Sequence, residues 1–81
     1  MRLDKYLKVS RLIKRRTVAN DACDNEHIMV NGRQAKASYQ VKLGDVIEIG
    51  YGNRMLKVEV TAIDEHANKA AAAAMYREVA E

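Results

Sequence analysis

Seven lysines and arginines stand within the first sixteen residues, and their types suit phosphate chemistry. They are Arg2, Lys5, Lys8, Arg11, Lys14, Arg15 and Arg16, with Asp4 as the single acid among them. A guanidinium can hold a phosphate through two parallel hydrogen bonds, and an ammonium adds a mobile point charge. A merely solvated helix face would normally mix both signs of charge. The group therefore predicts a surface that binds the phosphates of a nucleic acid.

The rest of the chain balances this positive end with negative charge. Residues 1–42 hold ten Lys/Arg against four Asp/Glu, a net charge of +6, whereas residues 43–81 hold four against seven, a net charge of −3. A concentrated positive field favours a polyanionic partner, because each neutralised phosphate releases condensed counterions. Asp4 could orient Lys8 or Arg11 by an ion pair, but we expect it mainly to favour the N-terminus of a helix.

Side chains suited to catalysis or metal binding do not form a convincing set. Cys23 and His27 are four residues apart, but zinc needs three or four ligands, and the other histidine is His66. Cys23 is better explained as a small buried side chain. The segment Gly50-Tyr51-Gly52 precedes a predicted strand and not a helix, which argues against a dinucleotide loop. The sequence predicts no enzyme, no metal and no cofactor.

Size and composition limit the class of protein. A chain of 81 residues can build one domain with one modest core. It contains no apolar run of the roughly 18 residues that a transmembrane helix needs, and it does not open with the apolar stretch of a signal peptide. A single cysteine rules out an intramolecular disulfide. With tyrosine as the only aromatic residue type besides histidine, there is no base-stacking platform, so RNA shape and phosphate geometry should guide recognition. We expect a cytoplasmic protein that does not bind a membrane.

Two amphipathic helices are predicted to position the cations. In residues 2–14, one side of the helix collects Leu3, Tyr6, Leu7, Ser10 and Ile13, and the cations fall roughly opposite. A second helix should span residues 18–25, with Thr17 as its N-cap. Its buried side would hold Val18, Ala19, Ala22 and Cys23.

Three strands and a further helix are predicted to follow. Residues 28–30 are β-prone and run into Asn31-Gly32, the strongest signal for a two-residue hairpin. Residues 46–49 form a second strand, and residues 56–62 alternate apolar and polar side chains as a half-buried strand does. Asp64 could cap a C-terminal helix that continues through the alanine run to about residue 79. The order α-α-β-β-β-α indicates a small α+β domain.

Several short motifs then occur in an order that resembles a known family. They are Arg2-Leu3-Asp4-Lys5-Tyr6-Leu7, Arg15-Arg16 at the second predicted helix, Val30-Asn31-Gly32, Lys36, Val41, and Leu43-Gly44-Asp45-Val46-Ile47. This ordered set is similar to the S4 RNA-binding domain over residues 2–49. The resemblance implies an S4-type RNA-binding domain, with two N-terminal helices packed on a short antiparallel β-sheet and a C-terminal helix. We predict this domain over residues 1–63 and a C-terminal helical extension of the same domain over residues 64–81.

Within the S4 family, the chain is similar to the small stand-alone factors of ribosome-associated quality control, which are relatives of the heat-inducible S4-domain protein. That resemblance implies a non-enzymatic factor that binds large ribosomal subunits obstructed by peptidyl-tRNA. It would contact ribosomal RNA and tRNA, and it would support the addition of alanines to the stalled chain by an RqcH-type factor. We expect a monomer associated with cytoplasmic ribosomes. An accessory domain of an RNA-modifying enzyme, such as a pseudouridine synthase, and a DNA-binding helix-turn-helix repressor are the alternatives.

The resemblance carries RNA contacts onto Arg2, Asp4 and Arg16, which match family motifs. Arg33 and Lys36 flank the predicted hairpin and could extend the RNA surface beside the second helix, whereas Asn31 is expected to serve the turn. The full predicted RNA-binding set is Arg2, Asp4, Lys5, Lys8, Arg11, Lys14, Arg15, Arg16, Arg33 and Lys36. The family usually has glycine just before the first strand, where this chain has Asn25-Glu26-His27. We expect Asn25 to adopt the left-handed conformation there.

Overall fold

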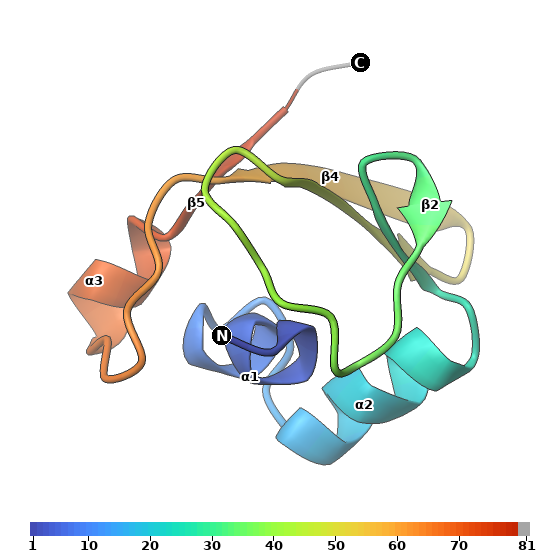
Figure 1. Cartoon of the computed structure of the whole chain (residues 1–81), viewed down its shortest axis with the longest axis horizontal. Coiled ribbons are helices and arrows are strands. Elements are labelled where there is room, and N and C mark those ends of the chain that lie inside the picture. Colours follow the sequence, from blue (N-terminus) through green and yellow to red (C-terminus); the bar gives the residue numbers. More distant parts are fainter. Residues whose placement is uncertain (80–81) are drawn as a thin grey trace.

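Two short helices pack against one face of a five-stranded antiparallel sheet in the computed structural model, which describes residues 1–79 except for the side chain of Tyr51 (Figure 1). The predicted α+β class is confirmed. The helices are α1 (Leu3–Val9), α2 (Arg16–Asp24) and α3 (Lys69–Ala73). The strands are β1 (Ile28–Val30), β2 (Arg33–Gln34), β3 (Val46–Tyr51), β4 (Arg54–Val60) and β5 (Tyr76–Glu78).

The strands lie in the order β2-β1-β3-β4-β5, and every neighbouring pair is antiparallel. The predicted Asn31-Gly32 hairpin is confirmed: φ is +54° at Asn31 and +81° at Gly32, the left-handed pair that a two-residue turn requires. The buried sheet face carries Ile28, Val30, Ile47, Ile49, Val58 and Val60. On the other face, Glu48 pairs with Lys57 and Glu59 with Arg77, so that face is solvated.

The core forms between the buried sheet face and the apolar side of α1. Leu3, Tyr6 and Leu7 are completely buried and Ser10 is nearly so, as the helical spacing predicts. Ile13 is also buried, although it lies beyond the helix. Tyr6 also donates its hydroxyl to the carbonyl of Met75 over 2.6 Å. The first helix is therefore fixed to the last part of the described chain as well as to the sheet.

The first helix is shorter than predicted and ends at Val9 rather than at residue 14. Ser10 is its C-cap, and Arg11 follows with φ at +64°. The Arg11 N–H donates to the carbonyl of Lys8 over 3.1 Å. A left-handed residue directly after the cap is a common way to end a helix, because it turns the chain so that the last carbonyls find donors.

The second helix begins at Arg16, with Arg15 as N-cap, so the expected cap at Thr17 is wrong. Ala19 and Cys23 are buried as predicted, and burial raises the pKa of the Cys23 thiol to about 11. Val18 is 51% exposed and does not belong to the buried side.

At the bend before β1, the left-handed residue is Glu26, with φ at +64°, and not Asn25. Asn25 is the C-cap of α2, and the next two N–H groups, of Glu26 and His27, donate back to Cys23 and Ala22. That bonding pattern requires the left-handed conformation one position later than predicted.

The predicted C-terminal helix is wrong in extent. Its helical part is α3, which is capped by Asn68 and not by Asp64, since the Asn68 side chain accepts the N–H of Ala71 over 2.9 Å. Residues 76–78 form β5 and pair with β4. Alanines offer little apolar area to bury, whereas Met75 is fully buried and its carbonyl accepts the N–H of Thr61. Burial of Met75 thus draws the chain back onto the sheet. Within residues 1–79, no helix has the length and apolar character that crossing a membrane demands.

Candidate nucleic-acid interface

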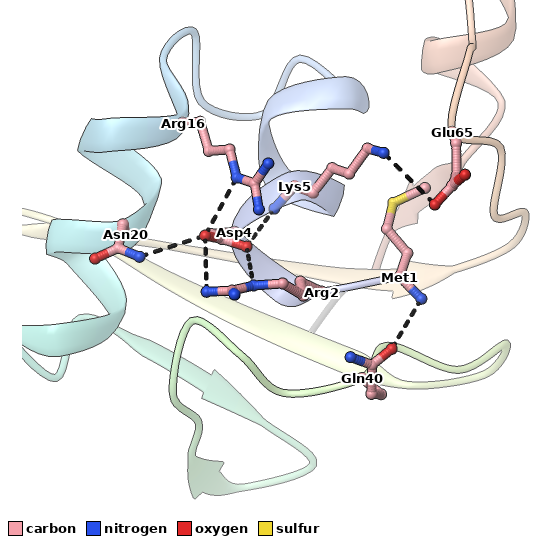
Figure 2. Close-up of polar contacts among 8 residues, drawn as sticks. All are labelled: Met1, Arg2, Asp4, Lys5, Arg16, Asn20, Gln40 and Glu65. Atoms are coloured by element: carbon pink, nitrogen blue, oxygen red, sulfur yellow. Dashed lines mark hydrogen bonds and ion pairs between the residues drawn. The ribbon is translucent and has the colours of Figure 1, made fainter.

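The centre of the basic surface is the carboxylate of Asp4, in the first turn of α1. Its side chain is only 3% exposed, although it carries a charge. Arg2 reaches it with Nε at 3.2 Å, and Arg16 reaches it with Nε at 3.3 Å (Figure 2). Asn20 of α2 adds a hydrogen bond from Nδ2 at 3.3 Å. One buried carboxylate therefore joins the residue before α1 to the first and fifth residues of α2.

The hydrogen bonds at the start of α1 explain why Asp4 lies where it does. Helix N-termini leave their first N–H groups without partners inside the helix. The N–H of Leu3 donates to Tyr39 and that of Asp4 donates to Ala37, so the loop after β2 covers the helix start. The Lys5 N–H donates to Asp4 Oδ1 over 2.8 Å. The loop and the helix thus hold the Asp4 backbone while its side chain faces α2.

The polar contacts keep Asp4 ionised. Burial by itself would raise the pKa of this carboxyl group, but hydrogen bonds from Asn20, Arg16 and the Lys5 N–H outweigh burial and lower it below its usual value. The expected interaction of Asp4 with the helix N-terminus is confirmed. The expected ion pair to Lys8 or Arg11 is wrong, because the carboxylate faces α2 and pairs with Arg2 and Arg16 instead.

Arg2 and Arg16 remain accessible despite their pairing. Their side chains are 46% and 49% exposed. Within residues 1–79, Arg16 meets Asp4 through Nε only, which leaves both Nη groups for another partner. Two guanidinium groups share one carboxylate, so the cluster keeps one positive charge and presents it to solvent.

The other predicted cations of the N-terminal segment are arranged around this cluster in different ways. Lys5 pairs with Glu65 at 3.5 Å, an acid from the turn before α3 (Figure 2). Arg15 is exposed at the N-cap of α2. Lys8, Arg11 and Lys14 line an open hollow beyond the end of α1. Residues 2–16 thus supply one paired cluster and one separate group of cations.

Arg33 and Lys36 are exposed, but the structure does not bring them into contact with the Asp4 cluster. Arg33 is on β2, the edge strand, and lines a shallow hollow with Asn31, Gln34 and Tyr39. Lys36 follows in the loop that covers the start of α1.

A second buried carboxylate, Asp45, has a structural role. It accepts hydrogen bonds from the Asn31 amide at 3.0 Å, the Tyr39 hydroxyl at 2.8 Å and the Lys42 N–H at 2.9 Å. Burial by itself would raise the pKa of Asp45, but these bonds lower it. Asn31 also accepts the N–H of Val46 through its side chain, so it joins the hairpin to β3, which goes beyond the turn role that was predicted for it. In residues 1–79, no group of three His, Cys, Asp or Glu could hold a metal ion.

Asn20 and Glu65 are the residues that sequence reasoning missed. Asn20 lies four positions after Arg16, a spacing that places two side chains on the same face of a helix, so its contact with the cluster had a readable signal. Glu65 had none, because it meets Lys5 from 60 positions away.

Comparison with known proteins first defines the class. A family model of the S4 domain matches residues 1–47, which include α1, α2, β1, β2 and the whole Asp4 cluster. The chain belongs to the S4-domain family. The solved trimeric structure of Vibrio cholerae Heat Shock Protein 15 has the same fold, with a TM-score of 0.90 and 30% sequence identity, over 99% of this chain and 82% of that chain.

Sequence relatives then define the particular group. The chain is 51% identical over 81 residues to the RQC P-site tRNA stabilizing factor of Streptococcus pneumoniae. The matched region covers 100% of this chain and 92% of the relative. It is 50% identical over 76 residues to the factor of the same name from Bacillus subtilis, with 94% of this chain and 88% of the relative covered. The chain belongs to the family of RQC P-site tRNA stabilizing factors.

Proposed function

We propose that this protein is a non-enzymatic RNA-binding factor of ribosome-associated quality control, present on cytoplasmic ribosomes. It binds large ribosomal subunits obstructed by peptidyl-tRNA, and it contacts both ribosomal RNA and tRNA. The names of its relatives support a role beside the P-site tRNA. The observation that carries the proposal is the convergence of Arg2 and Arg16 on the buried carboxylate of Asp4.

This cluster suits an RNA backbone better than a free arginine would. Arginine side chains lose conformational freedom when they bind, and that loss weakens binding. Asp4 already holds Arg2 and Arg16 in place while about half of each side chain stays exposed. We propose that the two arginines bind phosphates and that Asp4 and Asn20 position them. Lys5, Lys8, Arg11, Lys14 and Arg15 would extend the positive surface, with Arg33 and Lys36 at its margin.

Sedimentation of a tagged chain in a sucrose gradient tests the proposal. At low salt, we expect the protein from a cell lysate to co-sediment with large ribosomal subunits, and the signal should rise when peptidyl-tRNA accumulates on them. A tagged Arg2→Ala/Arg16→Ala variant is the matched control and should remain near the top of the gradient. Wild-type protein confined to the top would contradict the proposal.

The consequence of binding would be continued alanine addition to the stalled chain by an RqcH-type factor. In a strain that lacks this protein, we expect alanine tails on a stalled reporter to be lost, to return with the wild-type chain, and to remain absent with Arg16→Ala. We further propose that the protein acts as a monomer, because the Arg2–Asp4–Arg16 cluster is complete within one chain. Light scattering of the purified protein tests this point.

A further inference from the structure

We propose a second phosphate-binding site, formed by Lys8, Arg11 and Lys14 with His66, in the hollow beyond the end of α1. The inference rests on the proposed function, because its ligand is a backbone phosphate of the RNA that the Asp4 cluster binds. It adds a separate place at which this small domain holds that RNA, and it includes a residue from the acidic half of the chain.

The hollow is distinct from the Asp4 cluster. One wall comes from the end of α1 and the segment after it, and the other comes from the turn before α3. It is lined by Lys8, Val9, Arg11, Lys14, Glu65, His66 and Ala67. The hollow over the Asp4 cluster is lined by Asp4, Arg16, Thr17, Asn20 and Asp21, so the two share no residue.

The three cations in this hollow have no anionic partner in the described part of the chain. Within residues 1–79, no carboxylate forms an ion pair with Lys8, Arg11 or Lys14, although Arg2, Lys5 and Arg16 each have one. Three uncompensated positive charges around one depression repel one another and attract an anion. A backbone phosphate that enters the hollow can meet all three.

The wall formed by the turn before α3 carries one acid, Glu65, and one hydrogen-bond donor, His66. The Glu65 carboxylate would oppose an anion, but the Lys5 ammonium lies 3.5 Å from it and offsets its charge. His66 is held in the turn because its backbone N–H donates to Asp64 over 3.0 Å. Its imidazole can supply an N–H to a phosphate oxygen. The hollow therefore combines charge with a hydrogen-bond donor on the opposite side.

The backbone at Arg11 provides a clean test. Its φ of +64° suits glycine better than any residue with a side chain, so Arg11→Gly removes the charge without straining the fold. Glu26 follows the C-cap of α2 with the same φ of +64° and does not line the hollow, so Glu26→Gly is the matched control. In pelleting with large ribosomal subunits, we expect Arg11→Gly to weaken binding about five-fold and to reduce the slope of log affinity against log salt by roughly one. Glu26→Gly should not weaken binding, and neither variant should melt at a lower temperature than the wild type.

Variants of the remaining wall residues give effects of opposite sign. The double variant Lys8→Gln/Lys14→Gln should weaken binding more than Lys42→Gln/Arg54→Gln, which removes the same charge from exposed positions outside both hollows. His66→Ala should weaken binding by a few-fold. Glu65→Gln should strengthen binding, whereas Glu78→Gln, the same change at an exposed position on β5, should not.

The outcomes separate the two proposals. Absence of binding by the wild-type chain would contradict the proposed function itself. Binding by the wild type together with equal binding by the Arg11→Gly, Lys8→Gln/Lys14→Gln and Glu65→Gln variants and their controls would overturn the second site and leave the proposed function standing.

Discussion

The carboxylate of Asp4 determines how two of the arginines are held. It is 3% exposed and bonds to Arg2, Arg16 and Asn20 at 3.2–3.3 Å. An arginine fixed in this way gives up little freedom when it meets a phosphate, whereas a solvated lysine such as Lys8 must be ordered by the ligand. Residues with the same charge should therefore contribute unequally to binding.

We expect Arg16→Ala and Arg2→Ala each to lower affinity for purified large ribosomal subunits by about ten-fold or more, because a charge-assisted hydrogen bond contributes about 1.5–3 kcal/mol. Lys8→Ala and Arg77→Ala should have smaller effects, since Lys8 is a mobile point charge and Arg77 pairs with Glu59 on the sheet. Pelleting of the four variants measures this, with circular dichroism as the folding control. Equal affinity losses in all four, or none, would show that the site is placed wrongly.

The depressed pKa of Asp4 predicts an acid-sensitive contribution to stability. A carboxyl group whose pKa is lower in the folded than in the unfolded state stabilises the fold above its usual pKa of 3.8, and this stabilisation disappears as the pH falls through the folded value. The melting temperature of the wild type should therefore drop below about pH 4 more steeply than that of Asp4→Asn. Asp45→Asn should show the same flattening, because its pKa is lowered too. Parallel melting curves from pH 2 to pH 7 for all three proteins would contradict this prediction.

Charge along the sequence predicted which residues form the basic surface, but not which of them converge. The ion pair of Asp4 with Arg16 depends on how α2 crosses α1, and that crossing follows from the chain reversal at Arg11. The residue type of Arg11 gives no indication that its φ is positive. The cluster was therefore partly readable from family motifs and from the spacing of Asn20 after Arg16, whereas the Lys5 contact to Glu65 was not readable.

At the scale of elements, α1 is too short to be stable by itself. It has seven residues, and isolated helices shorter than about 12 residues are marginal in water. Its stability must come from buried Leu3, Tyr6 and Leu7, from the loop carbonyls at its start, and from the Tyr6 hydroxyl on Met75.

Tyr6→Phe tests the last of these contributions. It keeps the ring and removes one buried hydrogen bond, so we expect the free energy of unfolding to fall by about 1 kcal/mol. The Met75 carbonyl still accepts the N–H groups of Thr61 and Ala62, which limits the loss. Urea denaturation measures it. Tyr76→Phe is the control, because Tyr76 is half-buried and its hydroxyl makes no hydrogen bond within residues 1–79. Equal stability of the two variants would argue against a role for the Tyr6 hydroxyl.

Segments with a periodic pattern or a clear turn signal, such as β1 before Asn31-Gly32, were predictable, whereas β2 and β5 were not. Alternation identified β4, although the strand spans Arg54–Val60 and not residues 56–62, and helical spacing identified the core face of α1. The two residues of β2 and the three of β5 are too few to show a period. These strands form because β1 and β4 present backbone N–H and C=O groups with which they pair. The alanine run misled the prediction for the C-terminal segment, since helix propensity is weaker than the burial of Met75.

For the whole molecule, the positive N-terminal segment predicts strongly salt-dependent binding. If about five of its seven cations meet phosphates, the slope of log affinity against log salt should be roughly −3 to −4.5. Titration with large ribosomal subunits at several potassium concentrations gives this slope. A slope near zero would mean that the cations contribute to solubility and not to binding.

The contact between Tyr6 and Met75 joins positions 69 residues apart. A ribosome releases the N-terminal residues first, so during synthesis the α1 segment emerges long before the residues that complete its surroundings. A chain cut short before Met75 would lack that buried side chain and the whole of β5, and its core would stay open to water. The protein can thus complete the core around Tyr6 only after the ribosome has translated Met75.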